Sequence, residues 1–94
     1  MPRYKVAHIR EQGVDLIIIP LEGSFDHKIA SEQQEIVGEL QIRAQSAGLA
    51  GKVIPVWETD SGRMGFIAPQ NWHPFFRSLS LNSVVGNLNK EIYW

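Results

Sequence analysis

The sequence predicts a single small α+β domain that spans residues 1–94. Three observations favour this class. Short apolar runs are bounded by glycine and proline, as strands are. One longer stretch repeats apolar residues at helical spacing. Hydrophobic residues make up 44% of the chain, which is ordinary for a globular protein, and two domains within this length would each be too small to bury a useful core.

The N-terminal part predicts two strands joined by a tight turn. Arg3–Arg10 alternates, so that Val6 lies on one face of the first strand and Ala7 on the other. Gly13 supplies the positive φ that a tight hairpin turn requires. Val14–Ile19 is apolar on both faces, which indicates a central strand.

A helix is predicted after an irregular stretch that follows Pro20. Ser31 and Gln34 match a capping box, and Gly48 suits the position just beyond the helix end. Between them the apolar residues repeat at helical spacing and form one stripe: Ile36, Val37, Leu40, Ala44 and Ala47.

The second half predicts two more strands and a short helical turn. Lys52–Trp57 is the third strand, and because Pro55 lacks an N–H we expect this strand to be an edge or to contain a bulge. Arg63–Ala68 is the fourth strand. A helical turn is expected to open near Asn71, since the proline at position 74 is tolerated in a first turn.

The C-terminal part predicts a last helix and a docked tail. Ser80 or Asn82 can cap this helix, which carries Val84. Ile92–Trp94 would expose a large apolar area if left free, so we expect it to dock on a sheet edge or on a second subunit. The second possibility makes a homodimer the expected oligomeric state.

The two halves of the chain, 3–48 and 52–91, resemble each other. A glycine and a proline stand seven residues apart in both hairpins, and Val37-Gly38-Glu39-Leu40 is echoed by Val85-Gly86-Asn87-Leu88. The pattern predicts a ββα-ββα pseudo-repeat, with a four-stranded, mostly antiparallel sheet and two helices on one face. A glycine at the same place in both helices further predicts a close approach of Gly38 to Gly86.

Composition excludes several function classes. The net charge is -1, which gives no electrostatic signature of binding to nucleic acid or to anionic lipid, so nucleic-acid binding is only the third hypothesis. The chain has no cysteine, and its histidines lack metal-ligand spacing, so no metal, cofactor or catalytic residue is predicted. No apolar run is long enough to cross a membrane, and the first residues do not resemble a signal peptide, so we expect a cytoplasmic protein.

The densest cluster of large side chains is Asn71-Trp72-His73-Pro74-Phe75-Phe76-Arg77. Tryptophan and arginine dominate protein–protein hot spots, so the segment predicts a non-catalytic binding or assembly module with a protein partner or a second copy. The same aromatic residues are also the ones a small core needs. The predicted binding residues are Trp57, Trp72, His73, Phe75, Phe76 and Arg77.

An alternative function is a small enzyme or a small-ligand-binding protein. Its pocket is expected between Trp72-His73 and the loop Glu22–Lys28, because the two segments hold equivalent places in the apparent repeat. Around the second hairpin turn, Arg63 is expected to form a surface ion pair with Glu58 or Asp60.

Overall fold

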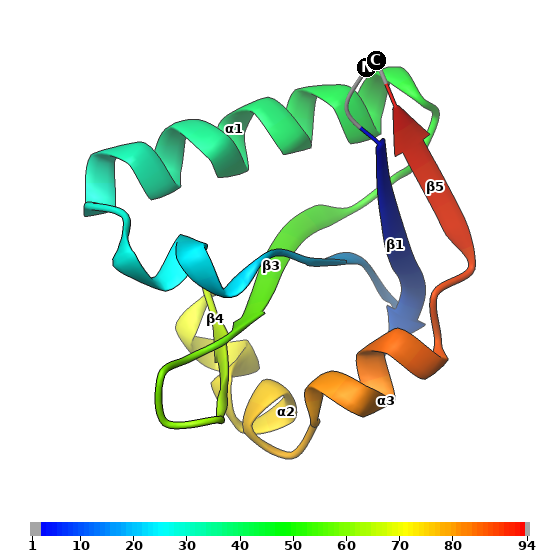
Figure 1. The fold of residues 1–94 in the computed structure, drawn as a ribbon. Coiled ribbons are helices and arrows are strands. Elements are labelled where there is room, and N and C mark those ends of the chain that lie inside the picture. The colour runs from blue at the N-terminus through cyan, green and yellow to red at the C-terminus, as the bar shows by residue number, and fades with distance from the viewer. Residues whose placement is uncertain (1–2, 94) are drawn as a thin grey trace.

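The computed structural model describes residues 3–93 and contains a five-stranded sheet (Figure 1). In the spatial order β4-β3-β2-β1-β5, the strands are β1 (Arg3–Glu11), β2 (Val14–Pro20), β3 (Lys52–Glu58), β4 (Met64–Phe66) and β5 (Lys90–Tyr93). β2 and β3 are parallel, and the other neighbouring pairs are antiparallel. The α+β class is confirmed. The prediction of four strands is wrong, because β5 adds a further strand beside β1.

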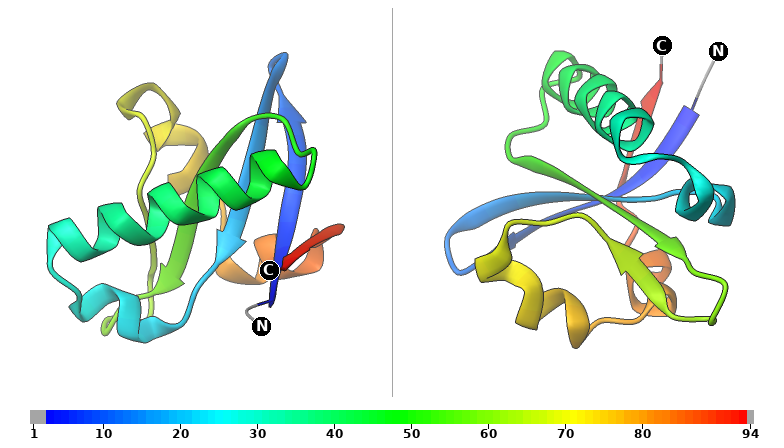
Figure 2. Two further views of the ribbon diagram at one scale, coloured as in Figure 1. Left: turned by 90° about the horizontal axis from the view of Figure 1, so that it is seen from above. Right: turned by 90° about the vertical axis from the view of Figure 1, so that its left-hand side faces the viewer.

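Helices cover both faces of the sheet (Figures 1 and 2). The helical elements are η1 (Gly23–His27), α1 (Ala30–Ser46), η2 (Gln70–Trp72), α2 (His73–Arg77) and α3 (Leu81–Gly86). In Figure 1, α1 lies above the strands, while α2 and α3 lie below them. The prediction of both helices on one face is therefore wrong.

The two-sided cover follows from the apolar character of β2. Leu16 and Ile18 point to one face and Ile17 and Ile19 to the other, and all four are buried. A strand that is apolar on both faces cannot leave either to water. The core layer between α1 and the sheet consists of Val6, Ile17, Ile19, Leu40, Ala44, Val53 and Ile92. The core layer between the sheet and the helices α2 and α3 consists of Ala7, Leu16, Ile18, Ile54, Val56, Phe76 and Val84.

The predicted pseudo-repeat is not confirmed. Each hairpin is followed by a helix, but the helices lie on opposite faces. Gly38 and Gly86 do not meet, since nothing lies within 4 Å of a Cβ built at either. The parallel pairing of β2 with β3 requires a long crossover connection, and α1 provides it.

The two ends of α1 differ in how well the sequence predicts them. The N-cap is Ile29, which makes no side-chain capping bond, so the predicted capping box at Ser31 is wrong. Instead, the Gln33 side chain donates to the Phe25 carbonyl oxygen at 3.0 Å and holds the first turn of α1 against η1. At the other end, Gly48 follows the C-cap with φ +83°, as predicted.

Pro55 lies in an interior strand whose pairing register is unbroken, so the prediction that β3 is an edge or contains a bulge is wrong. The N–H and C=O of one strand residue point to the same side, and the Pro55 carbonyl accepts from the Ile67 N–H at 3.3 Å on the β4 side. The missing N–H therefore faces the place where β4 has ended at Phe66. Because Pro55 has no N–H to donate beyond Phe66, β4 (Met64–Phe66) is shorter than the predicted strand Arg63–Ala68.

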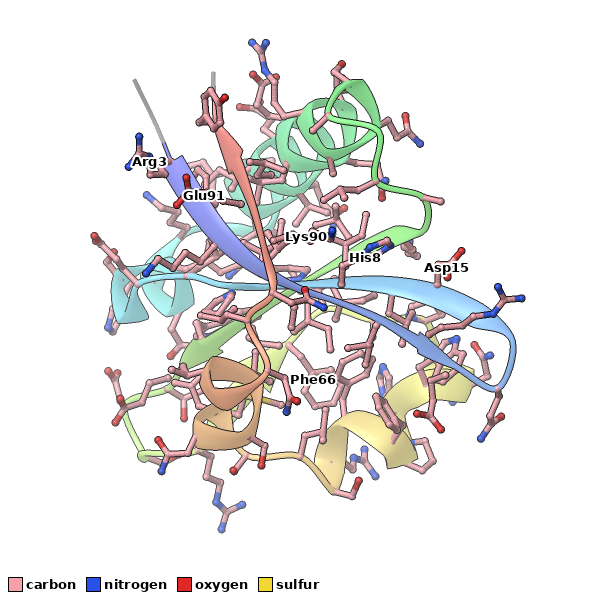
Figure 3. All side chains as sticks on the ribbon, turned by 90° about the vertical axis from the view of Figure 1, so that its right-hand side faces the viewer. Arg3, His8, Asp15, Phe66, Lys90 and Glu91 are labelled. Atoms are coloured by element: carbon pink, nitrogen blue, oxygen red, sulfur yellow. The ribbon has the colours of Figure 1, made fainter. Side chains whose placement is uncertain are left out.

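The C-terminal part folds back onto the chain's own N-terminal strand. The Ser80 hydroxyl caps α3 by accepting from the Ser83 N–H at 3.2 Å, as predicted. β5 then pairs with β1, and Arg3 Nε lies 3.5 Å from Glu91 Oε1 across the two strands (Figure 3). Docking on a sheet edge is thus confirmed for Ile92 and Tyr93. Trp94 lies outside the described residues.

Candidate functional site

The predicted binding segment, Trp72–Arg77, forms the end of η2 and the whole of α2; we call it the α2 segment. Pro74 stands in the first turn of α2, where a helix needs no N–H donor. Phe76 is fully buried against the sheet. Trp72, His73 and Phe75 are half-buried, and Arg77 is exposed. The segment therefore supplies one side chain to the core and keeps the others at the surface.

A chain of aromatic contacts runs from the core to this surface. The Phe66 and Phe76 rings lie 5.5 Å apart between centroids, and Phe75 meets Phe76 edge-on at 5.2 Å. Trp72 in turn meets Phe75 edge-on at 5.7 Å. Edge-to-face pairs of this kind stabilise a fixed orientation. The half-exposed rings of Trp72 and Phe75 are thus held by a fully buried one.

His73 connects α2 to the segment that follows β4. Its Nε2 lies 3.0 Å from the Ala68 carbonyl oxygen, and its ring meets Phe66 edge-on at 5.3 Å. A carbonyl oxygen accepts and never donates, so Nε2 carries the proton in this contact. The histidine therefore has a structural role in positioning α2.

Trp57 does not join the α2 segment. Strand alternation places it on the α1 face of β3, whereas its neighbour Val56 packs in the layer with Phe76. The indole is 6% exposed, packs on Phe25 at 4.8 Å, and donates from Nε1 to Asp26 Oδ1 at 2.9 Å. Trp57 thus offers almost no surface to a partner and instead fixes η1 on the sheet.

A shallow cleft of about 350 Å³, the Trp72 cleft, lies beside the α2 segment. Its walls are Gln12, Asn71, Trp72, Pro74 and Phe75. Gln12 belongs to the tight β1–β2 turn, where it and Gly13 both have positive φ, and its place in the lining brings this turn to the cleft. No local pattern indicated that the first hairpin would reach the aromatic segment, because the two are some sixty residues apart.

A second cleft, of about 640 Å³, lies between the β3–β4 hairpin and the α2–α3 connection; we call it the arginine cleft. Arg63 approaches it from the hairpin and Arg77 from the end of α2. Half-buried apolar side chains line it: Met64, Phe66, Leu79 and Leu81. Glu58 is the carboxylate in its lining.

The two arginines of this cleft have no ion-pair partner within residues 3–93, where the pairs are Arg3–Glu91, His27–Asp60 and Arg43–Glu39. The predicted ion pair of Arg63 is therefore wrong. Asp60 lies 3.2 Å from His27 Nε2 instead, so that the hairpin turn contacts η1. No sequence pattern assigned a binding role to Arg63, because only folding brings it to the same cleft as Arg77.

The structure does not bring together the two walls of the predicted pocket. Trp72 lines a cleft with Gln12, whereas Glu22 lines another with Tyr4 and Leu88. The physical reason is the two-sided cover of the sheet: η1 packs through Phe25 on the α1 face, and α2 packs on the opposite face.

Within residues 3–93, no group of three or more His, Asp or Glu side chains is placed to hold a metal ion. No helix in the same part of the chain has both the length and the apolar character of a membrane span. Comparison with protein-family models, with curated proteins and with solved structures gives no match to this chain.

Proposed function

We propose that the protein is a non-catalytic binding module that contacts a protein partner, or a second copy of itself as a homodimer, through the α2 segment. The carrying observation is that Trp72 and Phe75 remain half-exposed beside the Trp72 cleft, with Arg77 exposed at the end of α2. Residues of these types are the ones whose truncation costs most at protein interfaces. A cytoplasmic location remains part of the proposal.

The rigidity of the segment also supports this role. Trp72 and Phe75 are held edge-to-face, and Phe76 anchors α2 in the core. A surface that is already ordered loses little side-chain entropy on binding. The amide side chains of Gln12 and Asn71 at the same cleft add hydrogen-bonding groups that suit a polar rim.

The test is capture of a partner from a lysate of the source cells by wild-type protein, Trp72→Ala and Arg77→Ala. Arg10→Ala, an exposed arginine on β1, is the matched control. We expect capture by wild type and by the control, with loss in both α2-segment variants. Circular dichroism must show that each variant is folded. Sedimentation of the same four proteins tests self-association. Equal capture by all folded variants, or a monomer that captures nothing, would contradict the proposal.

A second candidate function is small-ligand binding, and the arginine cleft is the observation that favours it. Its volume of about 640 Å³ lies within the range typical of small-molecule sites, and its lining combines apolar side chains with charged and polar ones, including Ser80 and Asn82. In this candidate function, the arginine cleft takes the place of the pocket expected between Trp72-His73 and Glu22–Lys28.

A further inference from the structure

We propose that the arginine cleft binds a small apolar molecule that ends in an oxyanion, either a carboxylate or a phosphate. This inference rests on the second candidate function; it does not require partner binding by the α2 segment, although Arg77 belongs to both sites. It is carried by two guanidinium groups that have no ion-pair partner within residues 3–93 and that lie in one cleft with an apolar wall.

The charged side chains of the cleft determine the sign of the ligand's charge. Arg63 and Arg77 come from two separate elements, and neither has an ion-pair partner within the part of the chain that the structure describes. A guanidinium group matches the two oxygens of a carboxylate or a phosphate in a fork of parallel hydrogen bonds. Glu58 offsets part of the positive charge, so the cleft favours a ligand with one anionic group over a polyanion.

The walls set the shape of the ligand. Met64 and Phe66 come from β4, while Leu79 and Leu81 come from the α2–α3 connection. All four are half-buried, so an apolar ligand would remove their remaining surface from water. The Phe66 ring is held in place by its contacts with the rings of Phe76 and His73. The cleft therefore combines an apolar wall with two cationic groups and with the polar side chains of Ser80 and Asn82.

The experiment is a titration followed by NMR, with signals from the backbone, from arginine Nε–H groups and from the Met64 methyl group. The probes are naphthylacetate, naphthyl phosphate and the neutral naphthylacetamide. We expect saturable shifts at Arg63, Arg77 and Met64 with both anions and none with the amide. The stronger of the two anions identifies the headgroup. Raising the salt concentration should weaken binding of either anion.

Variants test the role of each charge. Arg63→Gln should weaken binding of the anionic probe about tenfold or more, since it removes a charge-assisted pair. Glu58→Gln should strengthen binding by about two- to fivefold, because it removes a like charge from the cleft. Arg10→Gln, which lies outside the cleft, should leave the affinity unchanged.

The outcomes separate this inference from both candidate functions. Equal binding of naphthylacetamide would keep the cleft as a ligand site but overturn the oxyanion. Absence of binding by every probe would overturn both the oxyanion and the small-ligand function, while partner capture by the α2 segment would be unaffected. Equal weakening in Arg63→Gln and Arg10→Gln would show unspecific charge attraction and overturn the inference. Concentration-dependent shifts at Met64 without any probe would mean that a second copy occupies the cleft, which would also overturn it.

Discussion

The side-chain amide of Asn89 pairs with both backbone groups of His8. The His8 N–H donates to Asn89 Oδ1 at 2.8 Å, and Asn89 Nδ2 donates to the His8 carbonyl oxygen at 2.9 Å. A residue of a neighbouring strand would make the same pair of bonds. Asn89 thus extends the ladder between β5 and β1 with its side chain, at the point where the backbone of the chain turns away to α3.

Asn89→Ala should destabilise the protein by about 1–2 kcal/mol, because two hydrogen bonds to the His8 backbone are lost. The free energy of unfolding can be measured by urea denaturation, and amide exchange at His8 should become faster. Asn87→Ala is the control, since Asn87 makes a single exposed bond to the Ser83 carbonyl oxygen. A larger loss in the control would contradict the role given to Asn89.

Two glycine substitutions should have effects of opposite sign. A Cβ at Gly65 would lie 2.6 Å from the Trp57 indole, so Gly65→Ala should destabilise the fold by about 1–3 kcal/mol through overpacking. A Cβ at Gly38 meets nothing within 4 Å, so Gly38→Ala should stabilise α1 by about 0.5–1 kcal/mol. Thermal unfolding checks both. A Gly65→Ala protein as stable as the wild type would count against the close packing of Gly65 on Trp57.

Asp26→Ala should destabilise the protein by about 1–3 kcal/mol, because the Trp57 Nε1–H would lose its acceptor in a nearly buried site. Asp26→Asn should retain most of the stability, since the amide oxygen can still accept. Tryptophan fluorescence and urea denaturation follow the change. In a Trp57→Phe background the cost of Asp26→Ala should nearly vanish, and a full cost there would refute the coupling.

Phe76 and Arg77 are neighbours in α2, and alanine substitutions at the two positions should distinguish an effect on folding from an effect on partner binding. Phe76 is 0% exposed, so Phe76→Ala should cost about 3–5 kcal/mol of stability. Arg77 is exposed, so Arg77→Ala should change stability by no more than about 0.5 kcal/mol while it weakens binding. The two variants are compared by thermal unfolding and by partner capture. A strongly destabilised Arg77→Ala would show that the arginine holds the fold.

The local features of the fold were predictable, because they depend on neighbours in the sequence. Gly13 and Gly48 have the positive φ expected of them, and Ser80 caps α3. The strand pairings were less predictable from the sequence. The apolar run on both faces of β2 already required helices on two sides, yet the repeat pattern suggested one side. The pairing of β5 with β1 joins the two ends of the described chain, and no local pattern encodes such a contact.

The candidate site divides in the same way. The clustering of Trp72, Phe75 and Phe76 located the α2 segment, but the sequence could not say that Phe76 alone would be fully buried. That outcome depends on which face of a short helix meets the sheet. The arginine cleft was missed because Arg63 and Arg77 belong to elements that meet through folding.

Pro55 has a consequence for the behaviour of the protein in crowded solution. Since β4 ends near this proline, the outer edge of the sheet offers a strand of three residues, Met64–Phe66. The opposite edge, β5, carries the exposed charges of Lys90 and Glu91. Long, flat, uncharged edges are templates for sheet-to-sheet aggregation, and short or charged edges resist it. The proline inside β3 thereby keeps the β4 edge short, which disfavours edge-to-edge aggregation.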